Sequence, residues 1–311
     1  MNWHMYKKLI VTGSIAYDEI MDFPGTFKDY FHPEKLHQIN VSFSLTGLEK
    51  QMGGTATNIA YSASLFKVPV SIRAAIGLDG REFKDFFEKN NIETNKLIHD
   101  KKLFTATGKV ITDKNDNQIW GFYFGAGETA EKLSFKDLKK SDLLIISANH
   151  PRAFLNCQKQ ALKRKIEYMY DPGMALTWIK TKDLVAGIKH CRYLVGNDYE
   201  MSMIETCMKK KLSDIRSKEQ IFITTLGPKG ISCEYEGKVI KVKQFPLKKI
   251  IDPTGAGDAW RGGFMASLIK GYDLVKALRL ANAVASFAIE KYGTVNHRPS
   301  YKAIEIRARS L

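Results

Sequence analysis

The sequence predicts an α/β protein built on a doubly wound, mainly parallel sheet flanked by helices. Short apolar runs recur along the chain, and each ends in a small or polar cluster, as Leu143–Ile146 ends at Ser147. Between the runs, apolar residues recur at helical spacing, for example over Ala56–Ala63 and Leu274–Ala288. Strands that are apolar throughout and alternate with helices are typical of parallel sheets buried on both faces.

The apolar runs are the expected strands of this sheet. They are Leu9–Val11, Ile72–Ile76, Leu143–Ile146, Tyr168–Tyr170, Tyr193–Val195 and Ile221–Ile223. Ligands of such sheets bind beyond the carboxyl ends of the strands, so the polar clusters that follow the runs are the candidate places for chemistry. One further hairpin, from residues 231–236 and 239–245 around Gly237, is expected at an edge of the sheet.

Two aromatic-rich stretches, at about residues 18–50 and 104–126, interrupt this pattern. Residues 39–45 alternate between apolar and polar, and residues 107–111 and 118–123 alternate on either side of a turn at 114–117. We expect the two stretches to pair as a small antiparallel β-sheet that forms a lid over the site; ordinary surface ribbons are the alternative. The chain then forms a single domain, residues 1–311, with the lid inserted into it.

Composition and charge exclude several classes of function. Lys and Arg number 48 against 33 Asp and Glu, a net charge of +15, but the basic pairs are dispersed and no known nucleic-acid-binding pattern accompanies them. We therefore expect no nucleic-acid partner. No apolar stretch reaches the roughly 18 residues of a membrane helix and no signal-peptide core is present, which predicts a cytoplasmic protein without a membrane partner. The spacing of the four cysteines favours neither a zinc site nor a disulfide framework.

The most informative segment is Asp252–Phe264, in which Gly255, Ala256, Gly257 and Asp258 lead into an apolar helical pattern. A Gly-Ala-Gly bend before a helix leaves backbone N–H groups unpaired, and the helix dipole adds positive potential, so we predict an anion hole. A carboxylate beside it suits phosphoryl transfer to an alcohol, which needs a base for the hydroxyl proton; a helix cap is the alternative for Asp258. The chain contains no P-loop, no complete dinucleotide fingerprint and no protein-kinase motif.

Together with Gly53–Leu65, this segment resembles the two signatures of the ribokinase-like (PfkB) carbohydrate and nucleoside kinases. The first signature reads G-G-x-x-x-N-x-A with a later A-x-L, and the two lie in the family's order about 200 residues apart. The resemblance covers essentially the whole chain. Two departures concern the acceptor contacts: Phe66 follows Leu65 where the family usually has Gly, and the G-x-D-x-x-G loop is shortened to Gly77–Gly80.

The resemblance implies a role for each matching residue. Asp258 would be the catalytic base, and Gly255, Ala256 and Gly257 would donate N–H groups to the transferring phosphate. ATP would contact Asn197, Thr225, Gly227 and Asn282. Asn197 and Glu200 would organise Mg²⁺, largely through water, and Asp252 and Thr254 resemble positions that help hold a monovalent cation such as K⁺ in many members. The alternatives are a helix cap with an exposed acid for Asn197 and Glu200, and a solvated helix residue for Asn282.

The acceptor would be a vicinal diol held by Asp18, Gly53, Gly54 and Asn58, which fits both sugars and ribonucleosides. A nucleobase needs an aromatic slot, whereas a sugar needs mostly polar contacts. The lid stretches supply Phe23, Phe27, Phe31, Phe43, Phe104, Trp120, Phe122, Tyr123 and Phe124. Several of these residues could alternatively form a small core of the lid itself.

Residues 22–27, 36–43 and 171–174 and the shortened loop also resemble bacterial adenosine and nucleoside kinases. We therefore predict an ATP-dependent kinase that phosphorylates the 5′-hydroxyl of a nucleoside, adenosine first, to give AMP. The alternative is an ATP-dependent sugar kinase, similar to ribokinase or fructokinase. A binding protein that has lost catalysis is disfavoured, because Gly255–Asp258 is intact. Both a monomer and a homodimer are compatible with the sequence.

Overall fold

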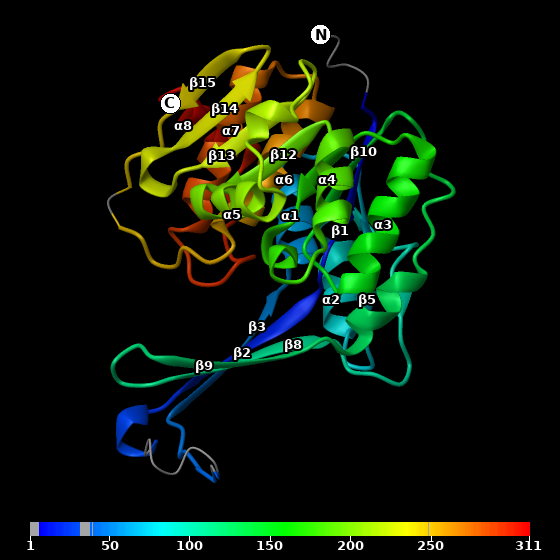
Figure 1. The fold of residues 1–311 in the computed structure, drawn as a ribbon. Coiled ribbons are helices and arrows are strands. Elements are labelled where there is room, and N and C mark those ends of the chain that lie inside the picture. Colours follow the sequence, from blue (N-terminus) through cyan, green and yellow to red (C-terminus); the bar gives the residue numbers. More distant parts are fainter. Residues whose placement is uncertain (1–5, 32–37, 39, 248) are drawn as a thin grey trace.

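A nine-stranded sheet carries helices on both faces, and a smaller four-stranded sheet projects from one end of it (Figure 1). This computed structural model describes residues 6–31, 38, 40–247 and 249–311. The strand order of the large sheet is β15-β14-β13-β12-β11-β10-β1-β4-β6. The strands are β1 (Lys8–Thr12), β4 (Val70–Arg73), β6 (Ile92–Glu93), β10 (Asp142–Ser147), β11 (Tyr168–Asp171), β12 (Tyr193–Asn197), β13 (Ile221–Thr225), β14 (Ile231–Tyr235) and β15 (Lys238–Val242).

The prediction of a mainly parallel sheet is confirmed. Strands β6, β4, β1, β10, β11, β12 and β13 are parallel to one another, and β14, which is antiparallel to β13, forms the expected hairpin with β15 at one edge. The predicted run at residues 72–76 is divided, because Ala75–Ile76 forms a separate strand, β5, which pairs with β7 (Ile98–His99). After β1 the chain builds β4 and β6 on one side and then returns to β10 on the other. In open α/β sheets ligands bind where the strand order reverses, which here is at the carboxyl ends of β1 and β10.

Two layers of helices bury the two faces of the sheet. One layer contains α1 (Thr55–Ser64), α2 (Arg81–Lys89), α6 (Ala256–Ile269), α7 (Leu274–Ala288) and α8 (Tyr301–Ala308), and the other α3 (Pro151–Arg164), α4 (Thr181–His190) and α5 (Asp198–Met208). Side chains of β1 alternate between the two cores: Leu9 and Val11 face the first layer, and Ile10 faces the second. Both faces of the strand are therefore apolar, as the uninterrupted runs predicted. Within the described residues, none of these helices combines the length and the apolar character needed to cross a membrane.

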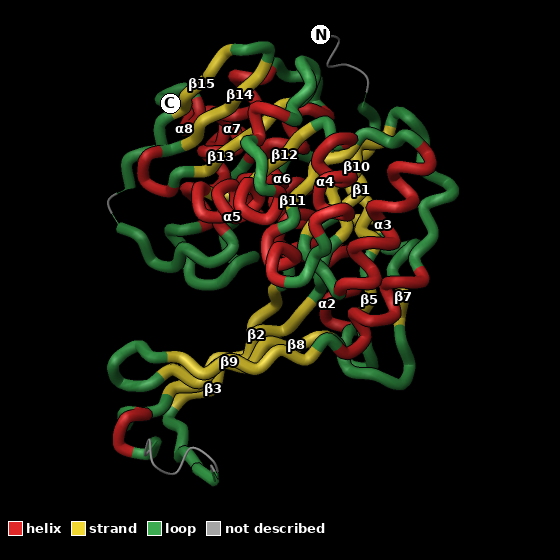
Figure 2. Tube along the Cα trace, in the orientation of Figure 1, coloured by secondary structure: helices red, strands yellow, loops and turns green. Residues whose placement is uncertain are grey.

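The small sheet, called the lid sheet below, is built from both aromatic-rich stretches (Figure 2). Its strands, in the order β3-β2-β8-β9, are β2 (Ala16–Asp22), β3 (Gly47–Gly53), β8 (Ala106–Thr112) and β9 (Gln118–Tyr123). The expectation of a purely antiparallel sheet was wrong, because β2 and β8 are parallel. The alternating residues 40–45 form a loop rather than a strand, and residue 39 lies outside the described residues.

Aromatic residues at the tip of the lid sheet pack against one another. The ring of Phe43 lies 4.7 Å from that of Phe23, 5.4 Å from that of Phe27 and 6.3 Å from that of Phe31. Phe23 and Phe27 are buried. For these four residues the alternative interpretation, a small core belonging to the lid itself, is what the structure shows.

The carboxylate of Asp113 ties this aromatic tip to the β8–β9 turn. Its Oδ2 accepts a hydrogen bond from the backbone N–H of Phe27 at 2.9 Å, and its Oδ1 accepts from the backbone N–H groups of Asn115 and Asn117 at 2.8 and 3.0 Å. Burial opposes ionisation, but these hydrogen bonds prevail and lower the pKa of Asp113 to about 2. The tie is therefore charged at any physiological pH.

Replacing Asp113 by Ala removes the acceptor for three backbone N–H groups, so we expect the lid tip to open more often while the core is unaffected. Native-state hydrogen exchange at Phe27, Asn115 and Asn117 should become faster by about tenfold or more. The matched control is Lys114→Ala, in the same turn, whose exposed side chain should leave exchange unchanged. Unaltered exchange at the tip of Asp113→Ala would contradict the role of this carboxylate.

Candidate functional site

Helix α6 is held between α1 and α7 by two adjacent glycines. A Cβ on Gly262 would lie 2.5 Å from the carbonyl oxygen of Ile59 in α1, and a Cβ on Gly263 would lie 2.5 Å from Cγ1 of Val284 in α7. No larger side chain fits at either position without moving a helix. The start of α6 therefore has a defined position relative to α1 and to the carboxyl edge of the sheet.

Asp258 lies in the first turn of α6 and faces α1. Its Oδ2 accepts a hydrogen bond from Nδ2 of Asn58 at 2.8 Å. The helix starts after Gly255, and no side chain caps it, so Asp258 does not serve as the cap that was its alternative interpretation. Burial raises the pKa of Asp258 to about 6, while Arg261 and the hydrogen bond from Asn58 lower it. Such a carboxylate is ionised at neutral pH, yet is a stronger base than an ordinary aspartate.

The bend before α6 requires glycine at its centre. Gly255 has a φ of 73°, and a Cβ there would lie 2.8 Å from Cγ2 of Thr294. First-turn N–H groups have no partner within a helix, so they point toward the space before it. The N–H of Ala256 is an exception, because it donates to the carbonyl oxygen of Pro253 at 3.2 Å. Of the three expected donors, Ala256 is thus already engaged within the bend.

Asp252 stabilises the bend from behind. Its Oδ1 accepts from the backbone N–H of Thr254 and its Oδ2 from that of Gly293, both at 2.9 Å. The carboxylate thereby joins the loop before α6 to the loop after α7. Asp252 and Thr254 are adjacent to the bend, as the sequence predicted, but both carboxylate oxygens are already occupied by backbone donors.

Arg261, which the sequence analysis did not single out, lies among three carboxylates. Its Nη2 is 2.5 Å from Oδ1 of Asp171 and 4.0 Å from Oε2 of Glu200, and Oγ of Ser147 donates to the other oxygen of Asp171 at 2.6 Å. The side chains of Arg261 and Asp171 are only 9% and 4% exposed. Burial lowers the pKa of Arg261, but Asp171, Asp258 and Glu200 raise it above its ordinary value. The sequence did contain a signal for this pair. Arg261 lies in an apolar helix and Asp171 ends an apolar strand, and charged residues in such positions need partners of opposite charge when they are buried.

The candidate ATP residues lie at the ends of two neighbouring strands. Asn197 ends β12 and is paired in register with Thr225, which ends β13; Gly227 follows in an exposed turn. Oδ1 of Asn197 accepts from the backbone N–H of Glu200, and Oε2 of Glu200 accepts from that of Asn197, both at 2.8 Å. This capping box begins α5 and matches the alternative interpretation of the pair.

The same pair is chemically suited to a hydrated cation. Oε1 of Glu200 accepts no hydrogen bond from the described residues, so one carboxylate oxygen remains at the sheet edge. In the described part of the chain, no three His, Cys, Asp or Glu side chains converge as metal ligands. Mg²⁺ keeps most of its waters and needs few protein ligands, so the pair fits water-mediated binding.

Asn282 is placed differently from either expectation. It is 0% exposed in α7, where its Oδ1 accepts from Nε1 of Trp260 at 2.7 Å and its Nδ2 donates to the carbonyl oxygen of Lys243 at 3.0 Å. The solvated alternative is therefore wrong. Both ends of the amide are occupied within the protein, which leaves the side chain unavailable to adenine in this arrangement. Asn282 joins α7 to α6 and to the segment after β15.

The candidate acceptor residues meet at the base of the lid sheet. A Cβ on Gly53 would collide with Oδ2 of Asp18. Gly54, the residue before α1, has a φ of 88°, and a Cβ there would collide with the carbonyl oxygen of Ser14, so only glycine fits. Burial raises the pKa of Asp18 to about 6. Asn58 follows Gly54 by four residues in the chain, but its side-chain amide donates a hydrogen bond to Asp258 rather than to Asp18.

The absence of a side chain at Gly108 lets Asp18 and two exposed aromatic rings come close to one another. Asp18, Gly108 and Phe122 are register partners on β2, β8 and β9 and therefore share one face of the lid sheet. A Cβ on Gly108 would lie 3.1 Å from Oδ1 of Asp18, 3.2 Å from Cζ3 of Trp120 and 3.6 Å from Cδ2 of Phe122. Trp120 and Phe122 are 56% and 50% exposed. A carboxylate and two solvent-facing rings thus border the same point.

A chain of aromatic contacts connects these rings to the residue before α3. Phe124 packs edge to face against Phe122 at 5.1 Å and against His150, the residue before α3, at 5.0 Å between ring centres. His150 was not identified from the sequence, because no local pattern distinguishes it. Trp120, Phe122 and Phe124 form a group separate from the buried aromatic tip described above.

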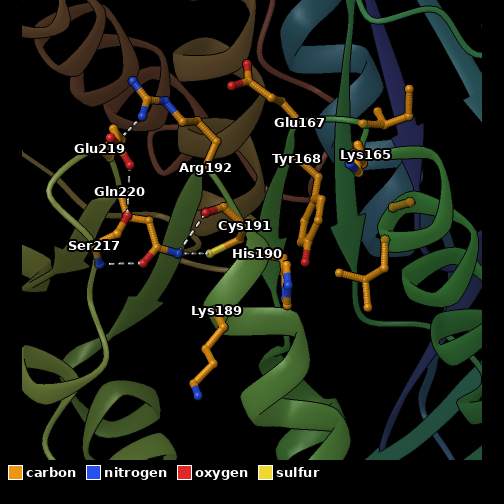
Figure 3. A pocket seen from close by; sticks show the side chains of 13 residues that line it. Lys165, Glu167, Tyr168, Lys189, His190, Cys191, Arg192, Ser217, Glu219 and Gln220 are labelled. Atoms are coloured by element: carbon orange, nitrogen blue, oxygen red, sulfur yellow. Dashed lines mark hydrogen bonds between the residues drawn. The ribbon is translucent and has the colours of Figure 1, made fainter.

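A cavity of about 300 Å³ lies at the opposite edge of the large sheet (Figure 3). It adjoins the amino ends of β11, β12 and β13, and charges of both signs line it, among them Lys165, Arg192 and Glu219. Gln220 stabilises one wall of the cavity, because its Nε2 donates hydrogen bonds to the carbonyl oxygens of Ile188 and Cys191 at 2.6 and 2.8 Å. The site residues lie at the carboxyl ends of the strands, so this cavity is not part of the site.

Comparison with known proteins agrees with this arrangement. A family model described as pfkB family carbohydrate kinase matches residues 16–300. The chain belongs to this family. As a PfkB kinase it is a phosphotransferase with an alcohol group as acceptor, and kinases of the family use ATP, generally with Mg²⁺.

Relatives within the PfkB family include both nucleoside and sugar kinases. The nucleoside kinase of Methanocaldococcus jannaschii is 28% identical over 282 residues, which cover 90% of this chain and 93% of the relative. The ribokinase of Haemophilus influenzae is 26% identical over 314 residues, covering 95% and 96%. A Burkholderia thailandensis nucleoside kinase solved in complex with inosine has a TM-score of 0.84 at 26% identity, covering 97% of each chain. These likenesses confirm the ribokinase-like fold and support the activity of an ATP-dependent nucleoside kinase or of a sugar kinase of the ribokinase family.

Proposed function

We propose that the protein is an ATP-dependent nucleoside kinase that phosphorylates the 5′-hydroxyl group, with adenosine as the first candidate and AMP as the product. The observation that carries the proposal is that the carboxylate of Asp18 and the rings of Trp120 and Phe122 converge around Gly108. A ribonucleoside combines a diol with a flat base, so one face of the lid sheet would contact both parts. The preference for adenosine derives from the resemblance of residues 22–27, 36–43 and 171–174 to bacterial adenosine kinases.

In this proposal the ribose diol donates hydrogen bonds to Asp18, and the 5′-hydroxyl meets Asp258. Asp258 takes the proton as the 5′-oxygen forms its bond to the γ-phosphorus and the bond to the leaving oxygen of ADP breaks. The free N–H groups of Gly255 and Gly257 and the dipole of α6 stabilise the negative charge of the transferring group.

Cations would assist from the other side of the site. Asn197 and Glu200 would hold Mg²⁺ through water beside Thr225 and Gly227, and the ion would neutralise phosphate charge. Asp252 and Thr254 would help hold a monovalent cation such as K⁺ behind the bend.

A sugar kinase is the second candidate, because Asp18 would bind the diol of a free sugar equally well and ribokinases are among the relatives. The aromatic residues distinguish the two functions: a free sugar gives Trp120 and Phe122 no base to stack on.

An acceptor panel tests this choice. Adenosine, inosine, cytidine, ribose and fructose should be compared by ADP release at saturating MgATP. We expect nucleosides to give values of kcat/KM at least about tenfold above those of the sugars, with adenosine highest, because stacking of the base contributes about 1 kcal/mol or more. Turnover of free sugars alone would contradict the nucleoside assignment, and a different nucleoside ranked first would correct only the base preference.

Replacing Gly108 by Val should displace Asp18 and Trp120, because a Cβ at this position would already lie 3.1 and 3.2 Å from them. We expect KM for the nucleoside to rise by about tenfold or more, with KM for ATP nearly unchanged, because in this proposal only the acceptor contacts these two side chains. The matched control is Gly121→Val on the opposite face of the same sheet, where a Cβ would meet nothing within 4 Å. Equal acceptor KM values in the two variants would place the acceptor elsewhere.

The pH dependence tests the base. With pKa values of about 6 for both Asp258 and Asp18, kcat/KM should fall as the pH drops below about 6, because protonated Asp258 cannot accept a proton and protonated Asp18 binds the diol less well. The acidic limb should therefore be steeper than for one group. Asp258→Asn should lower kcat by about 10²–10⁴-fold, whereas Asp116→Asn in the lid turn should not. Full activity of Asp258→Asn would refute the assignment of the base.

A further inference from the structure

Arg261 brings a guanidinium group to the N-terminal turn of α6. Helical side chains tilt toward the N-terminus, so a residue one turn after Gly257 reaches back along the helix. A Cβ on Gly257 would lie 2.6 Å from Nη1 of Arg261. The guanidinium therefore lies against the bend whose N–H groups are proposed to bind the transferring phosphoryl group.

Only one side of this guanidinium is used by the protein. Nη2 pairs with Asp171, which Ser147 holds from its other oxygen. Nε is buried without a partner, and Nη1 makes no hydrogen bond to the described residues. A buried donor without an acceptor is costly and calls for an explanation, and a catalytic role is one that applies to functional sites.

We propose that Arg261 is a further residue of the phosphoryl-transfer site, in which Nη1 donates a hydrogen bond to an oxygen of the transferring phosphoryl group. The proposal rests on the proposed position of that group at Gly255–Gly257. Asp171 binds Nη2 and so fixes the orientation of the guanidinium. Because the guanidinium is planar, Nη1 then points toward the bend. Arg261 keeps its proton throughout, since Asp258 takes the proton of the acceptor.

A purely structural role is the competing explanation, because Arg261 also neutralises the buried carboxylate of Asp171. The two roles differ in a double variant. Removing both members of a buried ion pair is often nearly neutral for stability, whereas removing one member leaves a buried charge unpaired. Arg261→Met combined with Asp171→Asn therefore removes the buried ion pair as a whole but does not replace the arginine's contact with phosphate.

The test measures kcat, KM and the unfolding midpoint of Arg261→Met, Arg261→Lys and the double variant, with whichever acceptor of the panel turns over fastest. We expect Arg261→Met to lower kcat by about 10²-fold, as for the loss of one donor to a transition-state oxyanion, with acceptor KM changed less than about threefold. The double variant should remain equally slow despite a recovered unfolding midpoint, and Arg261→Lys should be intermediate. Recovery of kcat to within about threefold of wild type in the double variant would overturn the proposal, as would a wild-type kcat in Arg261→Met.

Arg307→Met is the matched control, because it removes a partly buried ion pair with Glu290, 3.0 Å apart, between α8 and the segment after α7. It should lower the unfolding midpoint and leave kcat unchanged. Where Arg261→Met does not fold, the double variant alone decides. Asp258→Asn, measured in parallel, separates the two proposals: an inactive Asp258→Asn beside fully active Arg261 variants overturns only the role of Arg261, whereas an active Asp258→Asn overturns the proposed base.

Discussion

The close packing of α6 on α1 at Gly262 is the constraint on which the site depends. Because the two helices touch through backbone, residues one turn earlier on α6 face residues at the start of α1, and Asp258 meets Asn58. The same packing determines where the bend at Gly255 lies, and Asp252 then joins that bend to Gly293. The positions of the Asp258 carboxylate and of the bend before α6 thus follow from one helix contact.

The second organising feature is the concentration of charge at the carboxyl edge. Asp171, Glu200 and Asp258 come from three separate elements, and Arg261 is the cation that lies among them. Buried ion pairs contribute little to stability, since the cost of dehydrating both charges offsets their attraction. We therefore interpret this cluster as part of what the enzyme needs for binding and transferring a highly charged group.

Features that depend on neighbouring residues in the chain could be predicted, and those that depend on distant pairing could not. The strands at residues 143–146 and 221–223 and the bend at Gly255 each follow from a local pattern. The ion pair between Asp171 and Arg261 joins positions 90 residues apart, and no periodicity reveals it. The parallel pairing of β2 and β8 was missed because each stretch was expected to form its own hairpin. Alternation at residues 40–45 reflected packing of Phe43 into the lid tip rather than a strand.

The parallel pairing at the base of the lid sheet has a mechanical consequence. Ala16 and Ala106 are register partners where β2 and β8 leave the core, and the ends of β3 and β9, at Gly53 and Tyr123, lie beside them, so the projecting sheet is attached at one end and would move as a lever arm. Asp18 lies near its root and Trp120 farther out, and both are held in the same hydrogen-bonded sheet. A small rotation at the root would carry them together. Their spacing, and with it the size and shape of the molecule they accept, would stay constant while their distance from Asp258 changed.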